Sequence, residues 1–152
     1  MRGAVVLEFA LLAPLYFLLI LGIVQFGIMF WVDLTMQYAI REGARFAITG
    51  QGQDPDPSNE QRYQAIIRTI KENSIGLYDR VQPVIATSIN GGPLQSYGDP
   101  AQYNPGMFGG PGDIVTLQLN CTWPITIPLV FPYFPSGNYD FSVAATMRNE
   151  AF

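Results

Sequence analysis

The first residues of the chain combine a possible cleavage site with an isolated carboxylate. Gly3 precedes Ala4, and Glu8 is the only charged residue between Arg2 and Asp33. A cut between Gly3 and Ala4 would make Ala4 the new N-terminus and Glu8 the fifth residue after it. The new α-amine could then neutralise Glu8 of a neighbouring subunit inside an apolar helix bundle, where such a pair is far stronger than in water. Gly3 suits this chemistry because a membrane protease must approach the backbone closely.

Glu8 also has a simpler interpretation. An unpaired carboxylate in the centre of a membrane costs at least about 2.5–3.5 kcal/mol, and less near the interface. Glu8 could therefore lie at headgroup level, where it favours the N-terminus of a helix. The residues alone leave both interpretations open.

Catalysis and metal binding find little support in the residue types. The chain has no His, its only cysteine is Cys121, and its Asp and Glu residues are scattered. It also contains neither a Gly-x-Ser-x-Gly turn nor a phosphate-binding glycine loop followed by Lys. We therefore expect a protein that is not an enzyme and has no cofactor or metal. A net charge of −4 without a basic run also argues against nucleic-acid binding.

Residues 9–32 form a long apolar run that contains no charge. As a helix these 24 residues would be about 36 Å long, which is enough to cross a hydrocarbon layer of about 30 Å with some tilt. A secretory signal peptide has a shorter apolar run and a small-residue cleavage site, unlike Phe30-Trp31-Val32-Asp33. A core helix of this length would be unusual in so small a domain. The run predicts a single transmembrane helix in a lipid bilayer.

The helical pattern continues beyond the apolar run. Polar residues recur every four positions from Asp33, and small and apolar residues line another face until Gly50. We therefore predict one helix over residues 4–49. Within it, the run Arg41, Glu42, Gly43, Ala44 and Arg45 is either a solvated face with a weak ion pair or a surface for close packing. Gly43 and Ala44 favour packing, against the β-rich domain or a partner helix, because small side chains let another backbone approach.

A linker and a second helix are predicted next. Residues 50–57 contain Asp-Pro twice and form the linker, after which 58–152 form one domain. Ser58 resembles an N-cap with Gln61 at the third helical position. An apolar stripe at helical spacing predicts an amphipathic helix over about 59–74 that ends at Gly76. The stripe comprises Tyr63, Ile66, Ile67, Ile70 and Ile75.

The remainder of the chain has β character. Short strands are expected at 84–89, 114–123, 124–131 and 139–147, whereas residues 90–112 contain too many Gly and Pro for a regular element. In 114–123 the apolar side chains Val115, Leu117, Leu119 and Cys121 share one face, so Cys121 should be buried. The predicted fold class is α+β: a long N-terminal transmembrane helix, a second helix and an antiparallel sheet of three or four strands.

The start of the chain resembles the TadE-like family of pseudopilins, minor components of Tad (tight adherence) pilus machines, which belong to the type IV pilus systems. The family's processing motif is matched by Gly3, Glu8 and Phe9, and its run after the membrane segment by Arg41–Arg45. The ending Met147-Arg148-Asn149-Glu150-Ala151-Phe152 is also similar. A TadF-type pseudopilin is a closely related interpretation.

The resemblance implies a function and a location. It implies a leader peptide at residues 1–3, removed by a prepilin peptidase, and a minor pilin or pseudopilin that assembles or initiates a Tad pilus. Other Tad pilins and pseudopilins, the prepilin peptidase and inner-membrane platform proteins would be its partners. The protein would cross the bacterial inner membrane once, with its C-terminal domain in the periplasm, before incorporation in a surface pilus. The alternative is a membrane-anchored binding module or pilus-tip adhesin that uses the aromatic segments 97–108 and 123–139.

Overall fold

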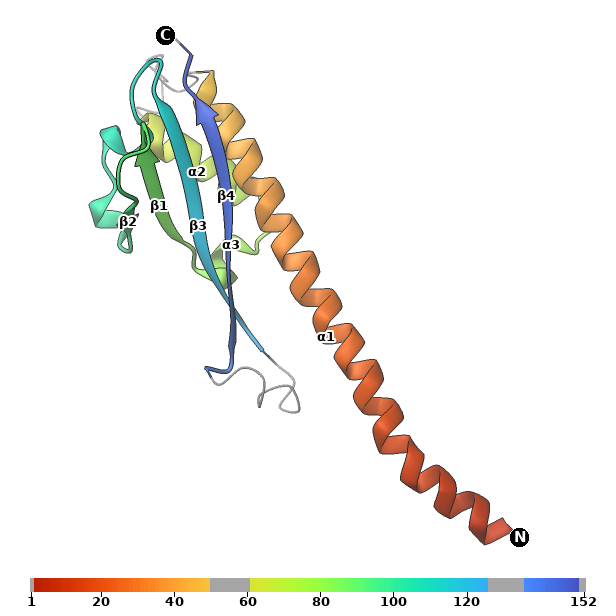
Figure 1. Cartoon of the computed structure of the whole chain (residues 1–152). Coiled ribbons are helices and arrows are strands. Elements are labelled where there is room, and N and C mark those ends of the chain that lie inside the picture. Colours follow the sequence, from red (N-terminus) through yellow and green to blue (C-terminus); the bar gives the residue numbers. More distant parts are fainter. Residues whose placement is uncertain (1, 50–60, 126–135, 151–152) are drawn as a thin grey trace. The chain divides into compact units, whose positions relative to one another are not determined.

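The computed structural model describes residues 2–49, 61–125 and 136–150 (Figure 1). The chain forms two compact units. The first comprises Met1–Trp31 and Trp123–Tyr139, and the second comprises Val32–Thr122 and Asp140–Phe152.

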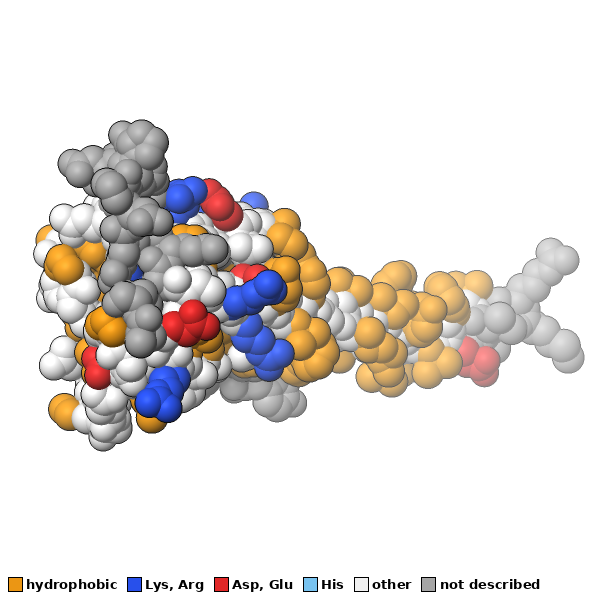
Figure 2. Space-filling model, turned by 90° about the horizontal axis from the view of Figure 1, so that it is seen from above, with side chains coloured by type: hydrophobic (Ala, Val, Ile, Leu, Met, Phe, Trp, Pro, Cys, Tyr) orange, Lys and Arg blue, Asp and Glu red, His pale blue; other side chains and the backbone are white. Residues whose placement is uncertain are grey.

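Helix α1, Arg2–Ile48, is the longest element and contributes to both units. The prediction of one long helix is confirmed, with a start two residues earlier than expected and an end one residue earlier. It is also the helix that is long and apolar enough to cross a membrane, and its most apolar stretch is wholly unburied. Figure 2 shows hydrophobic side chains over the visible surface of its N-terminal part, whereas Lys, Arg, Asp and Glu gather mainly elsewhere.

The second unit is built on a four-stranded antiparallel sheet with strand order β2-β1-β3-β4. Strands β1, Val84–Ile89, β3, Ile114–Pro124, and β4, Asn138–Arg148, are at the places that the sequence pattern predicts. Val115, Leu117, Leu119 and Cys121 are all buried, whereas the residues between them are less so, which confirms the expected face of β3.

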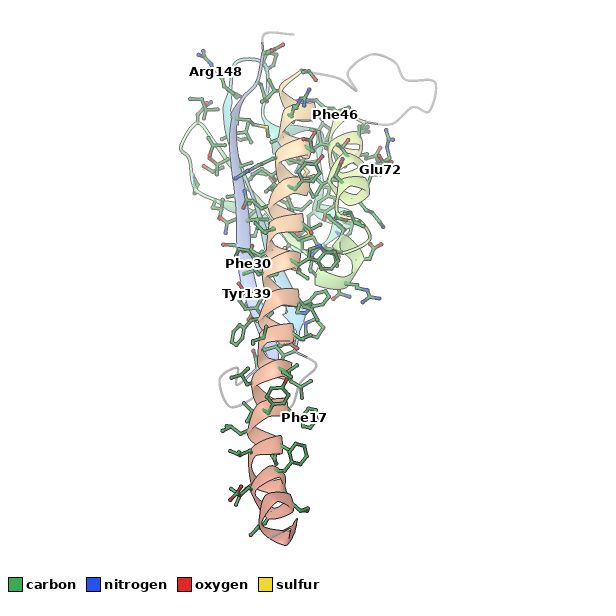
Figure 3. The ribbon with its side chains drawn as sticks, turned by 90° about the vertical axis from the view of Figure 1, so that its right-hand side faces the viewer. Phe17, Phe30, Phe46, Glu72, Tyr139 and Arg148 are labelled. Carbon is green, nitrogen blue, oxygen red and sulfur yellow. The ribbon has the colours of Figure 1, made fainter. Side chains whose placement is uncertain are left out.

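The buried face of the sheet is covered by α1 and by helix α2, Arg62–Asn73 (Figures 1 and 3). The Gln37 side chain in α1 donates a hydrogen bond to the Ala144 carbonyl in β4. Ile66 and Ile70 of α2 have no exposed surface. The core of this unit therefore lies between the sheet and two helices. A single helical turn, α3 (Tyr78–Val81), joins α2 to β1.

Helix α2 begins later than predicted. Its N-cap is Gln61, whose N–H donates a hydrogen bond to the Gln64 side-chain oxygen at 3.0 Å. The expected N-cap, Ser58, lies outside the described residues. The predicted stripe also needs correction at three positions. Tyr63 and Ile67 are only half-buried, and Ile75 is 73% exposed because the chain turns after Asn73 with a positive φ at Ile75.

The prediction that residues 90–112 contain no regular element is wrong. Strand β2, Gln95–Tyr97, pairs with β1, and its Tyr97 lies opposite Ile85. Two short 3₁₀ turns follow, η1 at Pro100–Gln102 and η2 at Pro105–Phe108. The fourth strand of the sheet is thus β2. The strand expected at 124–131 overlaps β3 only at Pro124, and its residues from 126 onward lie outside the described part of the chain.

Candidate functional site

The predicted processing site lies in the first turn of α1. The backbone of Gly3 and Ala4 is already helical, so a protease that needs an extended substrate must open this turn. The first four N–H groups of a helix lack partners within the helix, which makes such opening cheap. Glu8 lies one turn further along and is exposed, between Leu7 at 68% and Phe9 at 71% exposure.

Gly43 is packed against α2 of the same chain. A Cβ atom at this position would overlap the Ile70 side chain, lying 2.9 Å from its Cδ1 atom and 3.6 Å from the Ile66 carbonyl oxygen. Ala44 and Ala47 are buried on the same stretch of α1. The small side chains therefore let α1 and α2 approach closely, at the usual cost of glycine within a helix, about 1 kcal/mol.

The charged members of the same run are not part of this packing. Arg41 and Arg45 are exposed, and Glu42 is half-buried. The structure thus separates Arg41–Arg45 into a packing part, Gly43 and Ala44, and a solvent-facing part, the two arginines.

Comparison with known proteins bears on this stretch of helix. The model of the TadE family, described as TadE-like protein, matches residues 3–45. Residues 3–45 are TadE-like. The match includes Gly3, Glu8 and the run from Arg41 to Arg45, and nearly all of α1. No curated protein and no solved structure matches the chain.

Just after the TadE-like segment, the end of α1 is held by Arg62 and Glu150. The Arg62 guanidinium donates to the Ala47 carbonyl at 3.0 Å and to the Gly109 carbonyl at 2.9 Å. The Glu150 N–H donates to the Ile48 carbonyl at 3.2 Å. Two of the carbonyls that a helix end leaves unpaired are thereby satisfied, and a cation lies where the helix dipole favours it. Burial lowers the pKa of Arg62, which nevertheless remains a cation at neutral pH.

The C-terminal segment that resembled the family ending connects the same region to the sheet. Asn149 is 2% exposed, and its amide donates to the carbonyls of Phe108 and Gly110, both at 2.9 Å. Its N–H bonds the Asp113 carbonyl. Hydrogen bonds from Asn90 and from the Gly110 N–H hold the pKa of the Asp113 carboxyl below its usual value.

Arg62 and Asn149 are the residues in this region whose roles the sequence did not reveal. Only one signal pointed to either of them, the resemblance of residues 147–152 to a family ending. Their partners are backbone carbonyls far away in the chain, which leave no trace in local residue spacing.

Two groups of the second unit, Cys121 and Tyr78, have raised pKa values. Cys121 is 2% exposed, which confirms the prediction of a buried thiol, and burial, followed by the charge of Asp33, raises the pKa of Cys121 to about 12. Burial also raises the pKa of Tyr78, which shares a side-chain hydrogen bond with Tyr103. Both groups therefore stay neutral at physiological pH.

The aromatic segment 97–108, considered for ligand binding, contributes three side chains to the core, and its other residues are exposed or half-buried. Tyr97 is 8% exposed, and Met107 and Phe108 are 1% exposed. Among the described residues, no group of three or more His, Cys, Asp or Glu side chains could hold a metal ion.

Proposed function

We propose that this protein is a minor pilin or pseudopilin that acts in the assembly or initiation of a Tad pilus. The supporting observation is that the TadE-like match, residues 3–45, coincides with a helix that is apolar and exposed in its first part and packed on its own domain in its second. Such a helix can be held by lipid or by the helices of other subunits while its domain stays folded.

The proposal includes location and partners. The helix α1 anchors the chain in the bacterial inner membrane, with the domain in the periplasm. A prepilin peptidase cuts after Gly3, and Glu8 pairs with the new amine of a neighbouring pilin. Inner-membrane platform proteins then move the subunit into the growing structure. The role is structural, without a catalytic step of its own.

The test is deletion of the gene and complementation with the full chain. We expect the deletion strain to lose surface pili, counted by electron microscopy, and the complemented strain to recover them. A deletion strain with a normal number of pili would contradict an assembly role. If pili were normal but attachment to surfaces were lost, the adhesin alternative would be supported instead.

A further inference from the structure

The sheet of the second unit has a step where β3 continues beyond its neighbour β1. The first residue of β1 lies opposite Asn120, whereas β3 continues to Pro124. Gln82 would be the next partner, opposite Thr122, but it caps α3 in a left-handed conformation with φ 41°. Pro83 then has no N–H to donate to the sheet. The pairing with β1 therefore stops at Asn120.

The step leaves the backbone of Thr122 without a strand partner on the β1 side. The Asn90 N–H donates to the Ile114 carbonyl at 2.7 Å, in the same register as the other pairs of β1 and β3. In an antiparallel pair, every second residue directs both its N–H and its carbonyl toward the same neighbour. In β3 these are Ile114 and every second residue after it, including Asn120 and Thr122. Thr122 thus turns one backbone donor and one backbone acceptor toward the step.

A depression of about 410 Å³ lies at this step. Small-molecule sites typically occupy about 300–1,000 Å³. We call the depression the notch, and its lining includes Gln82, Val84, Asn120, Thr122, Asp140 and Ser142. All of its lining residues belong to the second unit and to the described part of the chain, and none of them is Lys or Arg.

Two side chains of the notch are held with a hydrogen-bonding group to spare. Asp140 accepts a hydrogen bond from the Thr122 hydroxyl through Oδ1 at 2.8 Å, and within the described residues its Oδ2 has no partner. Asn120 accepts from the Gln118 side chain through Oδ1 at 2.7 Å, which leaves its NH₂ group as a donor. The neighbouring strands β3 and β4 therefore present an amide donor and a charged acceptor in one depression.

This combination suits a ligand with adjacent hydroxyl groups. A hydroxyl donates one hydrogen bond and accepts others, so a carboxylate and an amide can satisfy neighbouring hydroxyls, and the bond to the carboxylate is the stronger. Val84 and the half-buried Phe141 add apolar surface for the C–H groups of such a ligand. Asp140 disfavours anions, because no cation in the lining offsets its charge.

We propose that the notch binds a neutral sugar. Asp140 accepts from one hydroxyl, Asn120 donates to a neighbouring one, and the Thr122 hydroxyl holds the Asp140 carboxylate in place. The site adds glycan recognition to the assembly role proposed above. It does not depend on that role or on membrane anchoring, because its lining lies wholly in the second unit.

Saturation-transfer difference NMR detects weak sugar binding and can be applied to the full chain in phosphatidylcholine nanodiscs, with empty nanodiscs as the blank. The probes are the methyl glycosides of mannose, galactose and glucose, together with methyl glucuronide, in which a carboxylate replaces the CH₂OH group of the glucoside. We expect at least one neutral glycoside to receive saturation from the wild-type chain. The glucuronide should receive none above the blank, because Asp140 repels its carboxylate.

Two substitutions at exposed positions test the notch itself. Asp140→Ala removes the charged acceptor and Thr122→Val removes the hydroxyl that holds it, so each should weaken binding of the neutral glycoside at least about tenfold. Thr116→Val is the matched control. Its hydroxyl lies on the same face of β3 and also bonds a β4 side chain, Thr146 at 3.1 Å, but it is outside the notch. This variant should bind like the wild type, and thermal unfolding checks that all three variants keep the fold.

The results that would overturn the proposal are distinct. If no neutral glycoside receives saturation from the wild type, sugar binding is refuted. Equal binding by Asp140→Ala would place the sugar elsewhere and refute the notch as the site. If no sugar binds but Asp140→Ala lowers the number of surface pili, the notch is instead a contact between subunits. Failure of the assembly role appears separately, as a deletion strain with normal pili, and leaves the sugar-binding result unchanged.

Discussion

At the scale of single residues, Gly3 controls access to the peptide bond that we propose is cut. Gly3→Leu should block processing, because the Leu side chain fills the space that the protease needs. Mass spectrometry of protein from the native membrane should then find residues 1–3 retained. Gly27→Leu is the matched control, because a Cβ at Gly27 meets nothing within 4 Å, and it should be processed normally. A mature mass for Gly3→Leu would contradict the proposed site.

Glu8 carries the second prediction at this scale. Glu8→Gln keeps the size and hydrogen bonding of the side chain but removes its charge, so insertion should become slightly easier. The variant loses pairing with an amine in low dielectric, and surface pili should be lost or reduced while the membrane fraction holds normal amounts of the protein. Pili are counted by microscopy beside a membrane blot.

The control for Glu8 is Glu72→Gln, which changes an exposed carboxylate in α2. It should leave pili unchanged. Normal piliation with Glu8→Gln would reject the pairing mechanism and favour the headgroup-level interpretation of Glu8. The peptidase step would be unaffected by that result, because it depends mainly on Gly3.

At the scale of elements, the contact between α1 and α2 depends on the missing side chain of Gly43. Gly43→Ala gains about 1 kcal/mol of helix propensity but forces a Cβ into the fully buried Ile70, and overpacking costs about 1–3 kcal/mol. We expect a net loss of about 1 kcal/mol, measured by thermal unfolding in detergent. Gly27→Ala should instead be neutral or stabilising.

A double-mutant cycle tests whether contact with Ile70 causes the loss of stability expected for Gly43→Ala. Ile70→Ala removes the atoms that a Cβ at Gly43 would meet, so the two substitutions together should cost less than the sum of their separate effects. Additive effects would show that a Cβ at position 43 does not meet the Ile70 side chain.

Helix α2 provides a second prediction for elements, based on its buried face. Ile66→Asp places an unpaired charge at a fully buried position and should cost about 4 kcal/mol or more of the free energy of unfolding. Ile75→Asp is the control: Ile75 is exposed and has a positive φ, which Asp tolerates better than Ile, so stability should stay equal or rise slightly. Denaturant unfolding compares them, and similar midpoints would contradict the position of α2.

At the scale of the whole molecule, Cys121 reports on opening of the core. A thiol reagent should label it only through unfolding, because the thiol is 2% exposed and its pKa is raised to about 12. Labelling should therefore be slow in native conditions and faster in Ile66→Asp. Rapid labelling of the folded wild type would show that β3 has the opposite register.

The pKa of Cys121 also predicts how stability changes with pH. The unfolded thiol ionises near its usual pKa of 9.0, whereas the folded thiol ionises near 12. Between these values the unfolded chain loses a proton that the folded chain keeps, so this group lowers stability as pH rises from about 9 to 12 and has no effect below that. Cys121→Ala should remove this part of the alkaline decline.

Much of the fold was predictable because its signals are local. Alternating residues in β3 and the long apolar run in α1 each repeat a pattern many times, so single exceptions do not hide it. The start of α2 was misplaced because Ser58 followed three residues later by Gln61 matches a capping box, whereas the observed N-cap is Gln61, a residue type that is not favoured there. The short strand β2 was missed because three residues carry too little pattern, and it exists through pairing with β1.

For the candidate site, the sequence by itself determined the features that depend only on residues close together in the chain. These are the apolar helix, Gly3 and Glu8 near its start, and the small residues at Gly43 and Ala44. Tertiary structure decided what those elements meet. It placed Gly43 against Ile70, the Arg62 guanidinium on the end of α1, and Asn149 among distant carbonyls. The physical reason is that helix and strand periodicity is written in adjacent residues, whereas packing and capping partners are chosen by shape and hydrogen bonding across the folded chain.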